Sequence, residues 1–207
     1  MDDLTETFLA AQAAFTARVH AVGDGQWQLG TPDAEWTVAD LTGHLVEEHR
    51  WAGPLLDGLE MMAAGAAVAA RWKPPGRDGT SLVPAWDEAA ARSAAAFRAG
   101  GALSGSVQIT RGWVPAVEYL EEMTLDLVVH AWDLGIAIGY PEPLPAAAVT
   151  AIYPLAQAIV DRRWRPTRPP PRTCRSTPRR RPASPVPTSP LCPGTPIPNR
   201  TWPGTRW

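Results

Sequence analysis

The chain has 207 residues, of which 45% are hydrophobic and 19% are charged, and this composition is typical of a soluble globular protein with one hydrophobic core. The formal charge of -2 combines two unlike parts, because residues 1–160 carry 8 basic and 20 acidic residues, whereas residues 161–207 carry 11 arginines and one acidic residue. We therefore expect one folded domain with a basic appendage, and no second core.

The chain begins with the acidic segment MDDLTETFLA, whereas a signal peptide begins with basic residues. No apolar run reaches the roughly 18 residues that a membrane span needs, so we expect a cytoplasmic protein without a membrane partner. Apolar residues recur at helical spacing over residues 3–22 and stop at Gly23, which predicts the first helix.

The second predicted helix covers residues 38–64. Thr37 offers an N-cap, and Asp40 three positions later makes the sequence close to a capping box. A Gly-Pro pair midway predicts a kink. Residues 65–84 contain the sequence Pro-Pro-Gly and are predicted to form a long loop, which is typical of a functional or mobile segment such as a lid.

Further helices are predicted over residues 85–98, 115–138 and 145–162, with a short extended piece at 106–110 that turns at an Arg-Gly pair. The helix over 115–138 is the most apolar and is predicted to lie in the core. Four or five helices with negligible sheet predict an all-α fold, a four-helix bundle with an extra short helix or extended segment.

The C-terminal segment 163–207 is rich in arginine and proline, and residues 161–207 hold 13 of the 23 prolines. Because this segment has few aliphatic side chains, we expect a disordered tail that follows a folded domain of residues 1–162. The abrupt change in composition suggests a frameshift, and a genuine basic extension is the alternative. Both cysteines, Cys174 and Cys192, lie in the tail, which excludes cysteine as nucleophile or ligand in the folded domain.

The strongest chemical signal lies on the apolar helix, where Asp126 and His130 are four residues apart and therefore project from one face. A buried carboxylate without a partner is costly, and a bound cation is one way to make such a site favourable. The alternative is that the pair forms an ordinary hydrogen bond on the helix surface.

His44 on the second helix can supply a third ligand. The set His44, Asp126 and His130 suits zinc, with nickel or iron(II) as alternatives, and leaves positions open for water or substrate. Glu48 lies one turn after His44 and can orient this histidine or accept a proton from a group bound to the metal.

Other residues with chemical potential are interpreted as structural. His20 ends the first helix and is assigned no role beyond a favourable interaction with the helix dipole. His49 is displaced by about 140° from His44 around the helix axis, so we expect it to face the surface or a loop. Among the ten tryptophans, Trp132 is the one expected to line a pocket beside the site.

Two sequence runs carry a family resemblance: AEWTVADLTGHLVEEHRW at residues 34–51 and EYLEEMTLDLVVHAWDLGIAIG at residues 118–139. Together they resemble the DinB/YfiT-like superfamily, specifically actinobacterial metal-binding proteins similar to the N-terminal domain of mycothiol-dependent maleylpyruvate isomerase. The resemblance covers about residues 4–160 and implies His44, Asp126 and His130 as metal ligands. It departs from that isomerase in having Asp126 where the isomerase has glutamate, and in lacking its second, C-terminal domain.

The resemblance implies a divalent metal that binds a low-molecular-weight thiol such as mycothiol and presents it to a small electrophile. A metal-dependent thiol S-transferase is therefore expected, with Glu48 as orienting or proton-accepting residue. Isomerisation of maleylpyruvate itself is not expected.

The open alternatives are a non-catalytic metal-binding or stress-related bundle and a metal-dependent hydrolase. Nucleic-acid binding by the arginine-rich tail is disfavoured, because the folded part carries a net charge of -12. A homodimer that pairs through an exposed helix face is also anticipated.

Overall fold

The computed structural model describes residues 2–164, and residues 1 and 165–207 lie outside the described part. Most of the predicted tail, 163–207, falls in that second range, so its disorder stays a prediction, as does the domain boundary at residue 162. The last helix extends two residues past that boundary. The elements in chain order are α1 (Asp2–His20), α2 (Val38–Leu56), α3 (Met61–Arg71), α4 (Gly79–Arg98), the short 3-10 helix η1 (Ala102–Ser104), β1 (Ser106–Ile109), β2 (Gly112–Pro115), α5 (Ala116–Ile138) and α6 (Ala146–Trp164).

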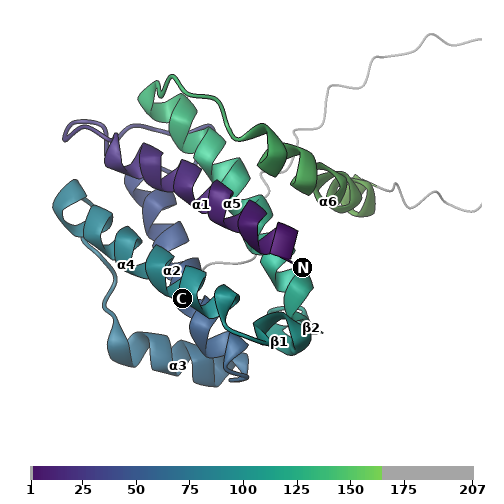
Figure 1. The fold of residues 1–207 in the computed structure, drawn as a ribbon. Helices are drawn as coiled ribbons and strands as arrows, with labels where there is room; N and C mark the ends of the chain where they lie inside the picture. Colours follow the sequence, from purple (N-terminus) through teal and green to yellow (C-terminus); the bar gives the residue numbers. More distant parts are fainter. Residues whose placement is uncertain (1, 165–207) are drawn as a thin grey trace, which may run out of the picture. The chain divides into compact units, whose positions relative to one another are not determined.

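Four of these helices form a bundle, which confirms the predicted all-α fold. Helix α1 packs along α5 and α2 packs along α4, while contacts of α1 with α4 and of α2 with α5 close the bundle (Figure 1). Helix α3 lies against α2, and α6 lies against α5 and α1. The site-bearing helices α2 and α5 are therefore direct neighbours.

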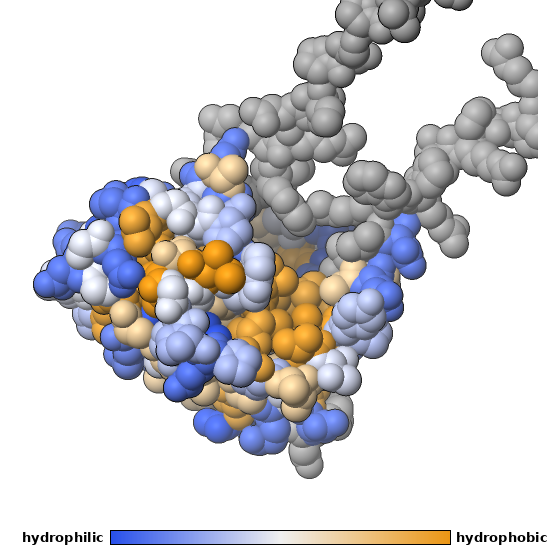
Figure 2. Space-filling view, turned by 90° about the horizontal axis from the view of Figure 1, so that it is seen from above, coloured by the Kyte–Doolittle hydropathy of each residue, from blue (hydrophilic) through white to orange (hydrophobic). Residues whose placement is uncertain are grey.

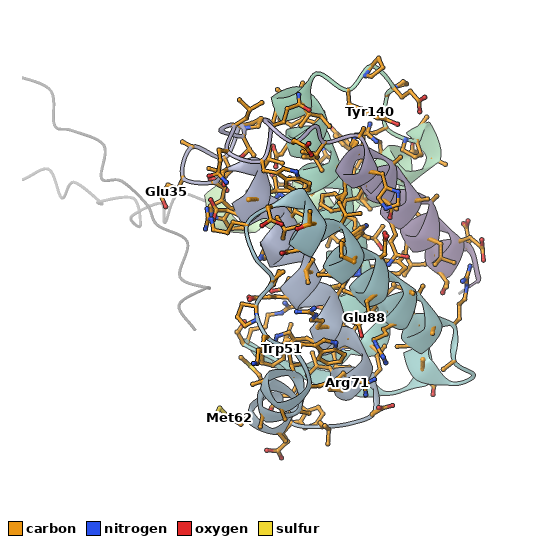
Figure 3. The ribbon with its side chains drawn as sticks, turned by 90° about the vertical axis from the view of Figure 1, so that its left-hand side faces the viewer. Glu35, Trp51, Met62, Arg71, Glu88 and Tyr140 are labelled. Atoms are coloured by element: carbon orange, nitrogen blue, oxygen red, sulfur yellow. The ribbon has the colours of Figure 1, made fainter. Side chains whose placement is uncertain are left out.

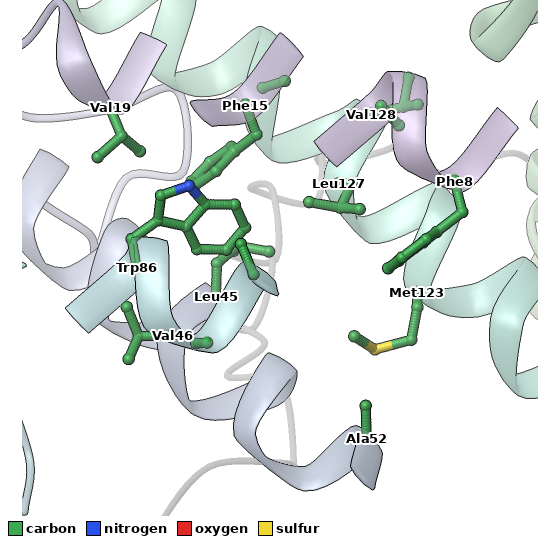
Figure 4. Close-up of a cluster of buried hydrophobic side chains, with 14 of the residues drawn as sticks. Phe8, Phe15, Val19, Leu45, Val46, Ala52, Trp86, Met123, Leu127 and Val128 are labelled. Atoms are coloured by element: carbon green, nitrogen blue, oxygen red, sulfur yellow. The ribbon is translucent and has the colours of Figure 1, made fainter. Parts of the chain in front are cut away.

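The core of the bundle consists of side chains that repeat at helical spacing on the inner faces. Figure 4 shows part of this cluster, in which Phe15 of α1 lies against Trp86 of α4. The Phe15 and Trp86 rings pack edge to face with centroids 4.7 Å apart. Such burial of large apolar side chains stabilises a fold by roughly 1.5–3 kcal/mol each.

The start of α2 forms as the sequence predicts. The Thr37 side chain accepts a hydrogen bond from the Asp40 backbone N–H, and the Asp40 carboxylate accepts one from the Thr37 backbone N–H, which completes a capping box. This cap fixes the entry of the chain into the helix that carries His44.

The predicted boundaries after α2 are wrong. Helix α2 ends at Leu56 although Pro54 lies inside it, and α3 occupies part of the segment predicted as a long loop. The physical reason is that residues 63–70 include six alanines, which favour helix strongly. Asp78 then caps α4 by accepting a hydrogen bond from the Ser81 backbone N–H, so the connection shrinks to residues 72–78.

The extended piece between α4 and α5 is an antiparallel hairpin, with Ser106 opposite Pro115 and Ile109 opposite Gly112. Gly112 has a φ of 109°, a backbone conformation that residues with a Cβ atom rarely adopt. Arg111 at the turn pairs with Glu118 and Glu122 and so ties the hairpin to the first turns of α5.

Apolar side chains are also exposed on the described surface, and Figure 2 shows them gathered on the face seen from above. None of the helices that the structure describes is long and apolar enough to cross a membrane.

Candidate metal centre

The structure brings His44 of α2 together with Asp126 and His130 of α5. His44 Nε2 lies 3.6 Å from Asp126 Oδ2, and His130 Nε2 lies 3.3 Å from Asp126 Oδ1. One potential ligand atom from each residue lies within 4.8 Å of the other two. All three side chains are partly buried, with exposed fractions of 18%, 32% and 12% respectively.

The local sequence explains this convergence. Asp126 and His130 are one turn apart on α5, and that turn faces the part of α2 where His44 projects inward. Leu127 and Leu45, which flank these residues in sequence, are fully buried, so the helices cannot rotate without exposing core side chains.

Asp133 positions the ring of His130. The His130 Nδ1–H donates a hydrogen bond to Asp133 Oδ2 over 3.0 Å, and Asp133 is itself buried. This contact places the ring proton on Nδ1 and directs the Nε2 lone pair of a neutral imidazole towards Asp126 and His44. Histidines that bind metals commonly donate their second ring N–H to a carboxylate in this way. Asp133 is not among the site residues predicted from the sequence, although its spacing of three residues from His130 places it on the same face of α5.

Trp36 covers the two histidines. Its ring centroid lies 4.8 Å from that of His44 and 5.6 Å from that of His130. Trp132, which we expected beside the site, is instead half exposed to solvent. The reason is geometric, because a residue two positions after His130 points away from the face that His130 occupies.

The electrostatics of the cluster depend on the two histidines and two carboxylates. Burial alone would raise the pKa of Asp126, but the imidazoles of His130 and His44 hold it well below its usual range. Burial alone would lower the pKa of His130, yet Asp126 and Asp133 raise it to about 9. Asp126 Oδ2 is buried without a hydrogen-bond partner, since the 3.6 Å to His44 is too long for one.

Glu48 and Tyr119 lie near the cluster without joining it by a hydrogen bond. Burial raises the pKa of the Glu48 carboxyl, while the charge of His44 opposes the shift and that of Asp126 adds to it. The Tyr119 hydroxyl, two turns before Asp126 on α5, is buried and has no hydrogen-bond partner in the described part of the chain. Burial, followed by the charges of Glu48 and Asp126, raises its pKa well above the usual value.

The prediction that His49 faces the surface is wrong, because this side chain is 1% exposed. Its Nδ1 lies 2.7 Å from Ser93 Oγ, and its ring lies between Phe8 and Trp86. Helix α2 is covered on more than one side, by α4 and α5, so a residue 140° from His44 is still inside the protein. His20 lies in the last turn of α1 and pairs with Asp87 over 2.8 Å, away from the cluster.

The chain is similar to a known protein family and to two mycobacterial proteins. Residues 8–135 match the family described as the mycothiol maleylpyruvate isomerase N-terminal domain. Two relatives, both uncharacterized proteins from strains of Mycobacterium tuberculosis, are 33% identical over 156 residues, which is 75% of this chain and 78% of each relative.

Two solved structures share the fold: mycothiol-dependent maleylpyruvate isomerase, with a TM-score of 0.52 and 21% identity, and a histidine-to-alanine mutant of that isomerase, with a TM-score of 0.53 and 18% identity. Each likeness covers 71% of this chain and 66% of the solved chain, so the matched part spans slightly less than two thirds of those structures.

Proposed function

Because the chain belongs to the mycothiol maleylpyruvate isomerase N-terminal domain family, we propose that it is a divalent-metal-dependent enzyme that transfers a mycothiol-type thiol to a small electrophile. The observation that carries the proposal is the convergence of His44, Asp126 and His130 from two helices around one buried carboxylate oxygen without a hydrogen-bond partner.

The residues present fit a divalent metal. Two imidazole nitrogens and one carboxylate form a ligand set that suits zinc, nickel or iron(II) and leaves coordination positions open. Asp126 Oδ2 is desolvated without a hydrogen bond, and a cation there would offset that cost. When His130 loses its Nε2 proton, Asp133 holds the remaining ring proton on Nδ1, so that Nε2 is the atom available to bind.

The thiol comes from outside the folded domain, because both cysteines of the chain lie in the segment after residue 164. A divalent cation beside a thiol lowers its pKa and favours the nucleophilic thiolate at neutral pH. We assign the sulfhydryl proton to the Glu48 carboxylate, whose raised pKa suits a proton acceptor. The new bond joins the thiol sulfur to a carbon of the electrophile, while the bond from that carbon to its leaving group breaks and the group departs with the electron pair, as chloride does from a chloroalkyl electrophile.

Surrounding residues shape the site for this reaction. Trp36 shields the histidine rings from solvent on one side, which strengthens the electrostatic interactions inside. The connection over residues 72–78, the remainder of the predicted lid, is tied down because Arg77 pairs with Asp40 at the start of α2. A closing movement of this segment is therefore not part of the proposal.

The test is the rate of conjugation of mycothiol to monochlorobimane. We expect turnover by the metal-loaded wild type, loss of turnover after chelation and in Asp126→Ala, and retention in His20→Ala, which removes a histidine outside the cluster. Equal rates in all four samples would contradict a catalytic metal. If the loaded wild type shows no turnover although it binds metal, the protein is a non-catalytic metal-binding bundle.

A further inference from the structure

A cleft of about 660 Å³ lies between α2, α3 and α4 and contains none of the residues His44, Asp126 or His130. Figure 3 shows this part of the molecule, with Trp51 of α2, Arg71 of α3 and Glu88 of α4 labelled. Its volume is in the range of small-molecule sites. The polar residues that line it are His49, Arg50, Asp57, Arg71, Trp72 and Arg92.

Two of the lining side chains are buried and carry nitrogen atoms without partners. His49 is 1% exposed and Arg50 is 7% exposed, and neither His49 Nε2 nor Arg50 Nε has a hydrogen-bond partner in the described chain. A buried polar atom left unpaired costs roughly 1–3 kcal/mol, so proteins rarely retain one without a compensating role. Here two adjacent residues retain one each, and both line the same cleft.

The hydrogen bonds at Nδ1 of His49 decide whether Nε2 carries the ring proton and can donate a hydrogen bond. Ser93 Oγ lies 2.7 Å from Nδ1, and Gln12 Nε2 in turn donates to Ser93 Oγ over 3.0 Å. The Ser93 hydroxyl has one proton, and both His49 Nδ1 and Ala90 O, which is 3.0 Å away, lie within its reach. Gln12 Nε2 also donates to Ala90 O over 3.1 Å, so Ala90 O keeps a donor when the Ser93 hydroxyl donates to Nδ1, and the ring proton of the neutral imidazole then lies on Nε2. His49 Nε2 and Arg50 Nε are then two unpaired N–H donors on adjacent residues that line the cleft.

Three guanidinium groups surround one indole ring in the cleft. The distances from the Trp72 ring centroid to the guanidinium carbons of Arg50, Arg71 and Arg92 are 5.6, 5.0 and 5.5 Å. Guanidinium groups bind carboxylate and phosphate oxygens through paired hydrogen bonds. The cleft therefore holds an unusual density of donors suited to an anion.

Nearby carboxylates limit the charge of the cleft. Glu88 accepts hydrogen bonds from Trp72 and Arg92 and lies 3.9 Å from Arg50. Asp57 lines the cleft, and the charge of Glu47 acts on Arg50. Because these acids balance the three arginines, the unpaired donors of His49 and Arg50 carry the argument for a ligand, and net charge does not.

The remaining lining is apolar and small. It consists of Gly53, Pro54, Ala67, Ala70 and Ala95, together with the Trp72 ring. Such a surface contacts a hydrocarbon or aromatic body better than a hydrated inorganic ion.

We propose that this cleft binds a small organic anion, with its carboxylate or phosphate group held by Arg50, His49 and Arg71 and its apolar body against Trp72 and the alanines. The site is separate from the proposed metal centre and does not depend on the metal.

The test is isothermal titration of the chelator-treated full chain, at fixed ionic strength, with benzoate, phenyl phosphate, inorganic phosphate and neutral benzamide. We expect saturable binding of benzoate or phenyl phosphate with a change in the His49 Nε2 nitrogen shift by NMR, and at least tenfold weaker binding of inorganic phosphate and benzamide. Preference between the two organic probes identifies the anionic group.

Variants locate the binding. Arg71→Ala, at an exposed position, should weaken the preferred probe about tenfold, and Arg50→Met, checked for folding by circular dichroism, should abolish binding. The matched control Arg98→Ala removes an exposed arginine of α4 outside the cleft and should leave binding unchanged. Failure of both organic probes to bind, equal losses in Arg71→Ala and Arg98→Ala, or inorganic phosphate binding as tightly as phenyl phosphate would overturn the proposal.

Discussion

His44 and His49 lie five residues apart on α2, yet only the ring of His44 lies against a carboxylate. His44 meets Asp126 beside His130, whose own ring lies between two carboxylates. His49 meets only neutral partners, Ser93 and Gln12, and aromatic rings. The difference appears in the pKa of the histidines, which is raised to about 9 at His130 and lowered by burial to about 3 at His49.

This contrast shows that burial alone does not make a site for a cation. The neutral surroundings of His49 favour an uncharged imidazole that holds α1, α2 and α4 together. The carboxylates around His130 favour positive charge, either as a proton or as a metal ion.

The largest expected effect is the loss of unfolding free energy at acid pH that His49 causes. Its folded-state pKa is lowered to about 3, so its contribution to stability is present above the unfolded value near 6.5 and is lost as pH falls below it. Between pH 7 and 4.5, chelator-treated wild type should lose about 3 kcal/mol more unfolding free energy than His49→Gln. Urea unfolding at several pH values measures this, and parallel pH profiles would contradict it.

Ser93→Ala should destabilise the fold by about 2 kcal/mol, because His49 Nδ1 and Gln12 each lose a buried partner. Metal affinity should remain unchanged, since the His49 region is separate from the metal centre. Urea unfolding and a metal titration of the same variant check both statements. If Ser93→Ala lowered metal affinity as much as His130→Ala does, the His49 region and the metal centre would not be independent.

The sequence was informative about helices whose signals are local. The capping box at Thr37 and the spacing of Asp126 and His130 depend on residues three or four apart, and both have the expected local geometry. The boundaries of α3 were missed because a run of alanines has high helix propensity but no amphipathic pattern.

The burial of His49 and the place of Trp36 could not be read from periodicity. A helical pattern identifies one buried face, whereas α2 is buried on several sides by helices distant in sequence. Trp36 belongs to a loop, where no periodicity exists, so only the tertiary fold brings its ring to His44 and His130.

Asp133→Asn tests the role of carboxylates around His130 in metal binding. Loss of the carboxylate that orients His130 should reduce metal affinity about 10- to 100-fold, as for other residues that orient metal-bound histidines. The effect on stability should be smaller than that of Ser93→Ala. Competition with a fluorescent zinc chelator measures the affinity, and an unchanged value would remove Asp133 from the site.

The smallest expected effect is the loss of unfolding free energy that His130 causes at alkaline pH in chelator-treated protein. The pKa of His130 is raised to about 9, so its contribution to stability is fully present below 6.5 and is lost as pH rises through 9. Compared with His130→Gln, wild type should lose about 1 kcal/mol over this range, because Asp126 is partly exposed and solvent screens the pair. If the stability difference between wild type and His130→Gln shrank towards acid pH instead of towards alkaline pH, the sign would contradict this prediction.

The central claim, that the carboxylate-paired histidines form a metal site and the neutral one does not, is tested most directly by the metal content of purified protein. Elemental analysis after dialysis should find about one equivalent of divalent metal in wild type, His20→Ala and His49→Gln, and almost none in His44→Ala or His130→Ala. Absence of metal from wild type after incubation with zinc, nickel or iron(II), or equal loss in His49→Gln and His130→Ala, would contradict the claim.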